Sequence, residues 1–213
     1  MMLSERVTTS QVRAAIVKAT SDLEAKAACL SQLDAAIGDG DMGHSIANGC
    51  RAIREELSQK HPDVMALLSE AGLIFSESAG ATIGALVGIA LLRAGATAKG
   101  KVDIGVSDLA EMLRAAEDGI RARGKAAAGD KTLLDAIIPA RQALESCAVK
   151  NCSLAKAGRD ILEASRAGMI ATTEMTAKFG RGRWLGERSK GHQDAGATAV
   201  YLLFSSLAGD IEG

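Results

Sequence analysis

The stretch Ile83-Gly-Ala-Leu-Val-Gly-Ile-Ala-Leu-Leu-Arg-Ala-Gly-Ala-Thr-Ala98 contains one charged side chain, Arg93, and no proline. A helix at the surface of a globular protein carries a polar face, and this stretch has none. It therefore predicts a helix that is buried on most of its sides. Alternating β-branched and aromatic runs are nearly absent from the chain, so we expect its neighbours to be helices as well.

Outward from this stretch, apolar residues recur three and four positions apart, separated by short segments rich in Gly and Asp. Aromatic residues make up only 2% of the chain, so the core must consist of Ala, Leu, Ile, Val and Met. The predicted helices cover about residues 10–37, a segment after the loop 38–43, a segment from about Pro62, residues 83–98, a segment opening at Ser107, a segment after Asp130 with a kink at Pro139, residues 153–178 and residues 195–207. The predicted fold class is all-α, an eight-helix antiparallel up-and-down barrel or bundle.

The Gly-rich breaks between these helices are the expected place for a site. They cover residues 38–43, 79–84, 124–131 and 180–196. In an up-and-down arrangement alternate connections lie at the same end, so these four breaks would meet at one rim.

Composition excludes several classes of function. The chain of 213 residues has 25 basic and 26 acidic side chains, so it lacks the basic surface by which most nucleic-acid binders gain affinity. The cysteines lack the C-x-x-C spacing of a structural zinc site. No signal-peptide pattern precedes Ser10, and no apolar run is long enough to span a membrane. We therefore expect a single domain over residues 1–213 that is soluble, cytoplasmic and free of contacts with nucleic acid or membrane.

The segment from Leu33 to Gly43 places Asp34, Asp39 and Asp41 within one helix end and the turn that follows. Converging carboxylates about 4 Å apart would repel by roughly 4 kcal/mol per pair at an effective dielectric of 20. A bound cation removes this repulsion, and hard oxygen ligands suit magnesium, which keeps open positions for phosphate oxygens. The alternative is that Asp and Gly here serve only to cap two helices.

These residues also carry a family resemblance. Leu33-Asp34-x-x-Ile37-Gly38-Asp39-Gly40-Asp41-x-Gly43 resembles the signature of the nucleotide-binding L subunit of dihydroxyacetone kinases. Three further motifs follow in the order typical of that family: Gly80-x-x-x-Gly84-x-Leu86, Arg123-Gly124-Lys125-Ala126 with Gly129-Asp130-Lys131-Thr132, and Gly180-Arg181 with Leu185-Gly186-Glu187-Arg188-Ser189-x-Gly191-His192-x-Asp194-x-Gly196. The resemblance spans essentially the whole chain, and four ordered motifs are far more specific than one.

The resemblance implies a barrel of eight antiparallel helices that binds ADP or ATP at one rim through magnesium ions, expected to be two. By position, Asp34, Asp39 and Asp41 would be the metal ligands. The implied nucleotide-binding residues are Met42, Gly43, His44, Ser45, Gly80, Thr82, Ile83, Gly84, Gly124, Leu133, Arg181, Asp194 and Gly196.

The sequence departs from the family pattern at several of these positions. Met42 stands where the family usually has His or Thr, while Ala81 and Ile83 replace a glycine and a serine of the phosphate loop. Because Met42 and Ile83 lack the expected hydrogen-bonding groups, nucleotide geometry or affinity is expected to differ. Ala195 replaces a proline, which is a milder change.

In this family a histidine on a different subunit anchors the substrate covalently, and no such domain fits within 213 residues. The expected function is therefore that of a kinase subunit, which phosphorylates dihydroxyacetone or a related short ketose held by a K-type partner. His44 and His192 lie in matched motifs, whereas His61 is expected to be an exposed loop residue. The donor is left open between exchanging ATP and bound ADP that a phosphocarrier M subunit rephosphorylates. A nucleotide-sensing regulatory subunit without kinase turnover is the alternative.

Overall fold

The computed structural model describes residues 6–209. The prediction about the start of the chain concerns in part residues 1–5, which lie outside this range. Within it the α-helices are α1 (Thr9–Ala25), α2 (Ala27–Ile37), α3 (Met42–Glu56), α4 (Val64–Ala79), α5 (Ala81–Thr97), α6 (Val106–Gly124), α7 (Leu134–Val149), α8 (Leu154–Ala171) and α9 (Ala195–Ala208). The short elements are strands β1 (Val7–Thr8) and β2 (Asp103–Ile104) and the 3₁₀ segments η1 (Thr172–Glu174) and η2 (Arg181–Ser189).

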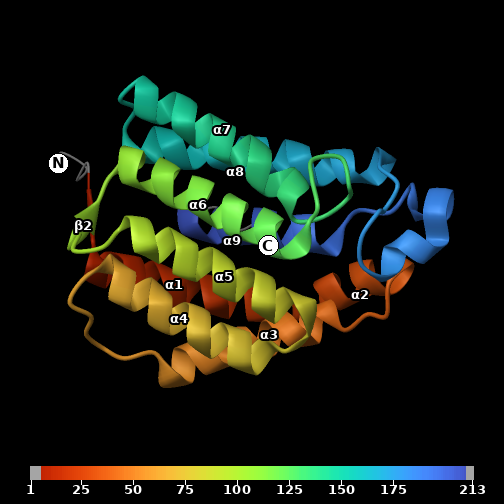
Figure 1. Ribbon diagram of the computed structural model, residues 1–213, viewed down its shortest axis with the longest axis horizontal. Coiled ribbons are helices and arrows are strands. Elements are labelled where there is room, and N and C mark those ends of the chain that lie inside the picture. The colour runs from red at the N-terminus through yellow and green to blue at the C-terminus, as the bar shows by residue number, and fades with distance from the viewer. Residues whose placement is uncertain (1–5, 210–213) are drawn as a thin grey trace.

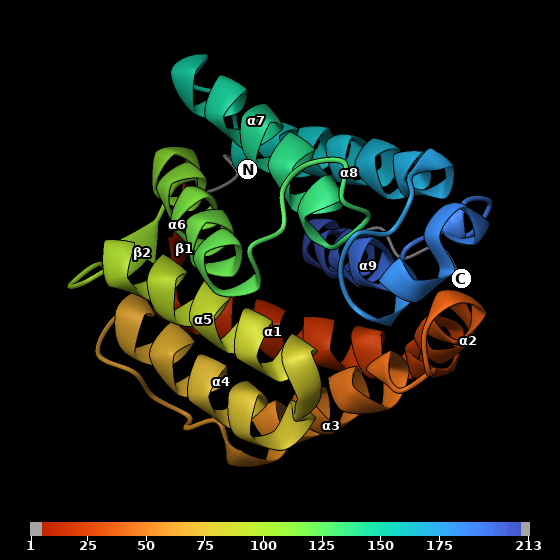
Figure 2. The same ribbon diagram turned by 45° about the vertical axis from the view of Figure 1, so that its right-hand side comes forward.

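The helices form a closed ring. From α3 to α9 each helix packs on the next one along the chain, and α1 closes the ring by packing on both α3 and α9. Figures 1 and 2 show the helices running antiparallel around a common axis. The predicted all-α barrel is confirmed.

The helix predicted over residues 10–37 is divided in two. It breaks at Lys26 (φ −98°, ψ 5°), after which α2 packs on α3, α9 and η2. Neither Gly nor Pro marks this position, so tertiary packing and not local sequence sets the break. The helix predicted over residues 153–178 ends earlier, at Ala171, and gives way to η1, where Thr172 is fully buried.

Glycines let the helices approach closely. A Cβ at Gly88 of α5 would lie 2.8 Å from the Cβ of Ser76 on α4, and one at Gly72 would lie 3.1 Å from the carbonyl oxygen of Gly88. The prediction that α5 is buried on most sides is supported by its packing on α3, α4 and α6. Small residues thus fill a core that contains few aromatic rings.

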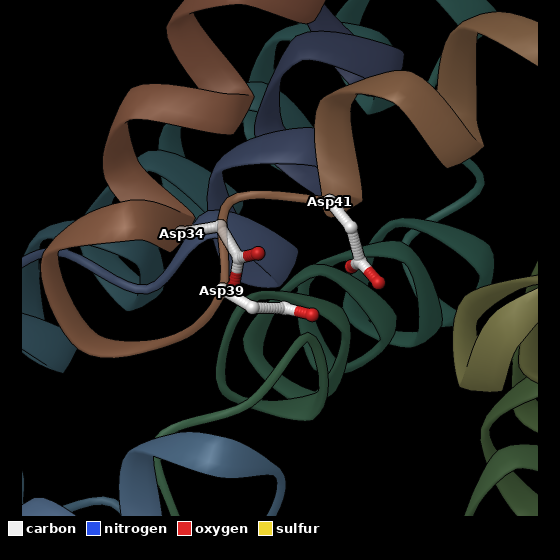
Figure 3. A group of neighbouring side chains, drawn as sticks. All are labelled: Asp34, Asp39 and Asp41. Atoms are coloured by element: carbon white, nitrogen blue, oxygen red, sulfur yellow. The ribbon is translucent and has the colours of Figure 1, made fainter.

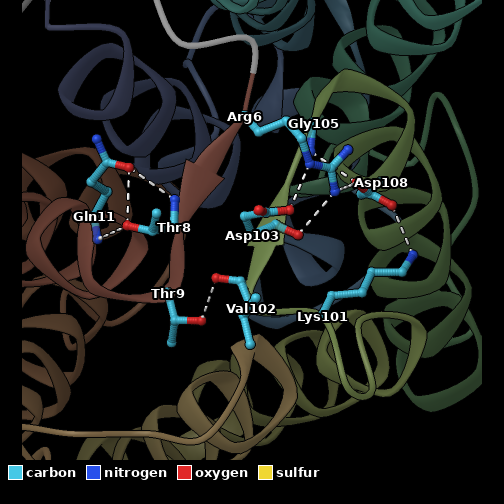
Figure 4. Close-up of polar contacts among 9 residues, drawn as sticks. All are labelled: Arg6, Thr8, Thr9, Gln11, Lys101, Val102, Asp103, Gly105 and Asp108. Atoms are coloured by element: carbon cyan, nitrogen blue, oxygen red, sulfur yellow. Dashed lines mark hydrogen bonds and ion pairs between the residues drawn. The ribbon is translucent and has the colours of Figure 1, made fainter.

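At the end of the barrel opposite to the Gly-rich breaks, the two-residue strands β1 and β2 pair antiparallel and join the start of α1 to the α5–α6 connection. Arg6 contacts Asp103 at 2.6 Å and Asp108 at 3.0 Å, and Lys101 contacts Asp108 at 2.8 Å (Figure 4). Thr8 caps α1 in a capping box with Gln11. These contacts fix the beginning of the ring.

The four predicted breaks do lie at one end of the ring. The connections α2–α3, α4–α5, α6–α7 and α8–α9 all gather on the right-hand side of Figure 1. We call this end the rim. Within residues 6–209 no helix is both long enough and apolar enough to cross a lipid bilayer.

Candidate functional site

Three carboxylates converge at the connection between α2 and α3. Oxygen atoms of Asp34, Asp39 and Asp41 all lie within 4.8 Å of one another (Figure 3). Asp34 sits in the last turn of α2, Asp39 lies in the turn, and Asp41 is the N-cap residue of α3. The side chains of Asp39 and Asp41 are 36% and 49% exposed, so a ligand can reach them.

Glycines make this convergence possible. A Cβ at Gly38 would lie 2.6 Å from the Asp34 Oδ1 atom, so a larger residue would displace that carboxylate. Gly40 has φ +77°, a left-handed conformation that glycine adopts without strain.

The capping alternative accounts for only one of the three carboxylates. Asp34 Oδ2 accepts a hydrogen bond from the Met42 backbone N–H at 3.3 Å, which satisfies one free group of α3. Asp41 occupies the N-cap position, yet its side chain makes no capping hydrogen bond. Asp39 makes an ion pair with Arg181. Two acidic side chains therefore have no capping role, and the donor set fits a hard divalent cation.

Arg181 reaches this cluster from η2, which packs on α2. Its Nη1 atom forms an ion pair with Asp39 and lies 3.5 Å from Asp41 Oδ2. The contact joins residues that are 140 positions apart in the sequence. The guanidinium therefore neutralises part of the charge that a metal ion would otherwise balance.

The first turn of α3 serves packing as well as any ligand. Gly43 is buried, and a Cβ there would lie 2.0 Å from the Ala27 carbonyl oxygen, so only glycine lets α3 meet α2. Ser45 is buried, while His44 is exposed at the rim. Met42 packs against the hydrophobic core that contains Leu30 and Phe75.

The first turn of α5 begins at Gly80, whose φ of +62° marks a sharp entry into the helix. Gly80 offers no capping side chain, so the N-terminal N–H groups of α5 are suited to bind an anion. Thr82 is exposed. Ile83 is 9% exposed and belongs to the hydrophobic core, so only its backbone could face a ligand.

A pocket of about 360 Å³ lies between the start of α5 and the end of α6. It is lined by Thr82, Ala85, Leu86, Arg123 and Gly124. The structure thus brings two of the predicted residues, Thr82 and Gly124, to one cavity. The sequence motif contained Arg123, but its place in the lining had not been predicted.

The α6–α7 connection is held by two buried carboxylates, Asp130 of a motif quoted above and Asp135, which the sequence alone did not single out. Asp135 accepts hydrogen bonds from the backbone N–H groups of Gly129 at 2.6 Å and Thr132 at 2.7 Å. Asp130 accepts from the Ala127 N–H at 2.7 Å and contacts Lys178 at 2.8 Å. Desolvation acts to raise the pKa of Asp130, but these hydrogen bonds outweigh it and the pKa is lowered.

Lys131 links this connection to the α8–α9 connection. It is 2% exposed, has φ +61°, and its Nζ donates to the carbonyl oxygens of Thr172 and His192. Burial lowers the pKa of Lys131, although the charges of Asp194, Asp135 and Glu174 oppose the shift. The motif around Lys131 was visible in the sequence, but its burial was not.

Leu133, Asp194 and Gly196 come together where α7 and α9 begin. A Cβ at Gly196 would lie 3.3 Å from the Leu133 nitrogen, so glycine allows the close approach. Asp194 caps α9 by accepting from the Ala197 N–H at 2.7 Å. Desolvation raises the pKa of Asp194 to about 6, although the Ala197 N–H and Lys131 favour its ionised form.

The prediction for His61 is wrong. Its side chain is only 4% exposed, and Nε2 lies 2.5 Å from Glu70 Oε2. Glu70 also accepts a hydrogen bond from the Ser58 hydroxyl at 2.7 Å. The residue therefore anchors the connection between α3 and α4 at the end away from the rim.

Comparisons with known proteins add to this geometry. The sequence profile of the DAK2 domain family matches residues 36–209. The ADP-binding subunit DhaL of the PEP-dependent dihydroxyacetone kinase of Escherichia coli (strain K12) is 33% identical over 180 residues, which cover 84% of this chain and 86% of that subunit. The D-erythrulose kinase of Mycolicibacterium smegmatis is 35% identical over 199 residues, 91% of this chain but only 33% of the relative.

Among solved structures, the dihydroxyacetone kinase from C. freundii in complex with AMP-PNP and Mg²⁺ superposes with a TM-score of 0.72 at 25% identity. The match covers 93% of this chain and 33% of that kinase. The chain thus corresponds to about one third of a longer enzyme in both the erythrulose kinase and the C. freundii kinase.

Proposed function

Because the chain belongs to the DAK2 domain family, we propose that it is the nucleotide-binding subunit of a dihydroxyacetone-type kinase. In this proposal it binds ADP or ATP with magnesium at the rim. A phosphoryl group passes from the nucleotide to dihydroxyacetone or a related short ketose held by a partner subunit. The observation that carries the proposal is the convergence of Asp34, Asp39 and Asp41 at the rim.

The carboxylates would hold magnesium, expected to be two ions, and the ions would neutralise phosphate charge during phosphoryl transfer. Asp39 and Asp41 have the accessible oxygens for this role. The N-terminal turns of α3 and α5 supply backbone N–H groups and positive dipole ends for the phosphates. Thr82, Arg123 and Gly124 line the cavity that is suited to the nucleoside part.

Arg181 would take one of two positions in this proposal. In the structure its guanidinium pairs with Asp39 and Asp41. In the other position the guanidinium would leave the two carboxylates and contact phosphate oxygens by bidentate hydrogen bonds. Catalysis then comes from positioning and charge neutralisation, as is usual in phosphoryl transfer.

The ketose would be carried by a K-type partner subunit through a covalent bond to a histidine of that partner. Support comes from the E. coli relative, which is named as one subunit of its kinase. The D-erythrulose kinase, a longer protein, supports the wider substrate class of short ketoses.

Two forms of this function differ in the phosphoryl donor. In one form ATP exchanges freely, and in the other ADP stays bound and a phosphocarrier M subunit rephosphorylates it. The name of the E. coli relative, a PEP-dependent kinase, favours the second form. Retention of ADP by the purified protein through gel filtration would support that form, and loss of the nucleotide would support the first.

The regulatory alternative is suggested by Met42 and Ile83, the two positions where the sequence lacks the hydrogen-bonding groups of the family pattern. Both side chains pack on the hydrophobic core, so their apolar character has a structural reason. No feature of the described residues therefore favours a sensor over a kinase subunit. A regulator would bind nucleotide and give no sugar phosphate with any K-type partner.

The test is the substitution Asp39→Asn. We expect it to abolish magnesium-dependent ADP binding in calorimetry and to leave the helix content unchanged in circular dichroism, because Asn keeps the size of the side chain and removes its charge. Asp118→Asn, at an exposed position of α6, is the matched control and should bind as the wild type does. Undiminished binding by the Asp39 variant would remove the metal assignment.

A further inference from the structure

The 3₁₀ segment η2 presents an apolar side chain to solvent at the rim. Trp184, the single tryptophan of the chain, is 75% exposed. The Arg183 guanidinium carbon lies 4.5 Å from the centre of its ring, which is a cation–π contact. A single exposed apolar residue is common, but tryptophan is enriched among the residues that dominate binding energy at protein interfaces.

Buried residues hold the segment that carries Trp184 against the barrel. Ser189 is fully buried; its hydroxyl accepts from the Ala177 N–H at 2.9 Å and donates to the Gly186 carbonyl oxygen at 2.6 Å. Gly182 is buried, with Ala177 and the Ile37 carbonyl within 3.4 Å of a Cβ placed there. Binding through a segment that is already ordered costs little conformational entropy.

Further contacts tie both sides of the segment to the barrel. The Thr176 hydroxyl donates to Glu187 at 2.9 Å, and the Gly191 N–H donates to the Thr173 carbonyl oxygen at 2.8 Å. Arg181 pairs with the acidic cluster on the α2–α3 connection. The backbone that carries Trp184 is therefore tied to the barrel beside the proposed site of the phosphates.

The exposed surface of this segment is basic. Arg183, Arg188 and Lys190 are exposed. The one acidic residue within η2, Glu187, is paired with Lys190 at 2.6 Å. A partner that complements this surface must present acidic side chains around an apolar pocket.

We propose that η2 docks the substrate-carrying subunit, with Trp184 inserted into an apolar pocket and Arg183 and Arg188 facing acidic residues of that subunit. The inference rests on the proposed function, because it takes the ketose carrier as the occupant. It assigns the contact to an ordered segment that also touches, through Arg181, the carboxylates proposed to bind magnesium. Docking at this place would bring the ketose to the nucleotide.

The experiment measures the affinity of the full chain, saturated with magnesium and ADP, for the purified substrate-carrying subunit from the same organism. Trp184→Ala should raise the dissociation constant about tenfold or more, because truncating a central aromatic anchor removes much of the binding free energy. Val149→Ala is the matched control, since Val149 is 83% exposed and is the last residue of α7. The α7–α8 connection lies at the end of the barrel opposite to the rim (Figure 1). This control should bind as the wild type does.

A second pair of variants tests the charges. Arg183→Glu and Arg188→Glu should each weaken binding about fivefold or more, and the loss should shrink at high salt because exposed charges are screened. Lys150→Glu, next to Val149, is the control for charge reversal. Equal affinity of the η2 variants and their controls would overturn the proposal.

Separate titration of ADP distinguishes this inference from the proposed function. Trp184→Ala should bind ADP with unchanged affinity when the partner is absent. Weakened ADP binding with unchanged partner affinity would place the indole in the nucleotide site and overturn the docking assignment. A change only in self-association of the chain, measured by sedimentation, would identify a second copy as the occupant and overturn it as well. Failure of the proposed function itself would appear as unaltered ADP binding by Asp39→Asn.

Discussion

Asp194 caps a helix, yet burial of its ionised carboxylate lowers the stability of the fold. Its carboxylate caps α9, where the helix dipole favours a negative charge, and it lies near the buried Lys131. Desolvation nevertheless prevails and raises its pKa to about 6, from an ordinary value of 3.8. The folded chain therefore holds a proton on this carboxyl more tightly than the unfolded chain does.

We predict that Asp194→Asn changes the dependence of stability on pH. A folded-state pKa that is raised gives stability that is present below about pH 4 and is lost as the pH rises through about 6. Asn keeps the cap but cannot ionise. From pH 4 to pH 7 the wild type should therefore lose up to about 3 kcal/mol of unfolding free energy relative to the variant, at about 1.4 kcal/mol per pKa unit.

Urea denaturation of both proteins across this pH range measures the difference. A difference in unfolding free energy that stays constant from pH 4 to pH 7 would contradict the raised pKa.

At the same scale, the sequence identified the residue types of the site better than their surroundings. The spacing of Asp34, Asp39 and Asp41 with glycines between them predicted convergence, and the structure confirms it. The surroundings of Met42 and Ile83 were not predictable, because their burial depends on helices distant in the sequence. The burial of His61 was not predictable either, because it depends on Glu70 of the next helix, whose carboxylate contacts the imidazole.

At the scale of elements, α8 lies against α7 at a point where only glycine fits. A Cβ at Gly168 would lie 2.1 Å from the Asp135 carbonyl oxygen and 2.9 Å from Pro139 Cγ. Asp135 also holds the backbone of the α6–α7 connection through its carboxylate. The packing of α8 on α7 and the order of the α6–α7 connection therefore both depend on Asp135.

We predict opposite effects for two Gly→Ala substitutions in α8. Gly168→Ala should destabilise the fold by about 1–3 kcal/mol or more, because backbone must move to admit the methyl group. Gly158→Ala is the matched control: its Cβ would have Ala208 at 4.0 Å as its nearest neighbour. It should stabilise the fold by about 0.5–1 kcal/mol through helix propensity.

Thermal and urea unfolding of both variants measure these changes. Equal effects of the two substitutions would show that helices α7 and α8 are further apart than the structure has them.

Element boundaries were the least predictable feature. The helix over residues 10–37 had an unbroken apolar pattern, but α2 turns away at Lys26 to pack on other elements. The 3₁₀ segment η2 and the two-residue strands carry too few residues for a periodic signal. Their positions depend on contacts between distant segments.

At the scale of the whole molecule, the rim draws on helices from all around the ring. The acidic cluster comes from α2 and α3, the pocket from α5 and α6, and Arg181 from the connection before α9. A ligand held by these groups would stabilise the entire barrel, because unfolding of any sector would destroy the site.

We predict that magnesium and ADP together raise the melting temperature. At a ligand concentration of 100 times the dissociation constant the stabilisation is about 2.7 kcal/mol, which corresponds to roughly 5–10 °C for a chain of this size. ADP with a chelator should give a much smaller shift. The Asp39→Asn variant should show no magnesium-dependent shift, whereas Asp118→Asn should match the wild type. A shift that ADP produces equally with and without magnesium would contradict the role of the carboxylates.

The sequence by itself determined the fold class, the family and the residues that form the acidic cluster. These depend on local patterns: helical periodicity, glycine punctuation and short ordered motifs, and the match over residues 36–209 confirms the family. The assignment of the individual nucleotide-binding residues stays a prediction.

Only the tertiary structure decided where helices end, which side chains are buried and which segments share the rim. Closure of the ring brings Arg181 to Asp39 and buries Lys131 between two connections. Such contacts arise from packing between residues far apart in the chain, and no local pattern encodes them.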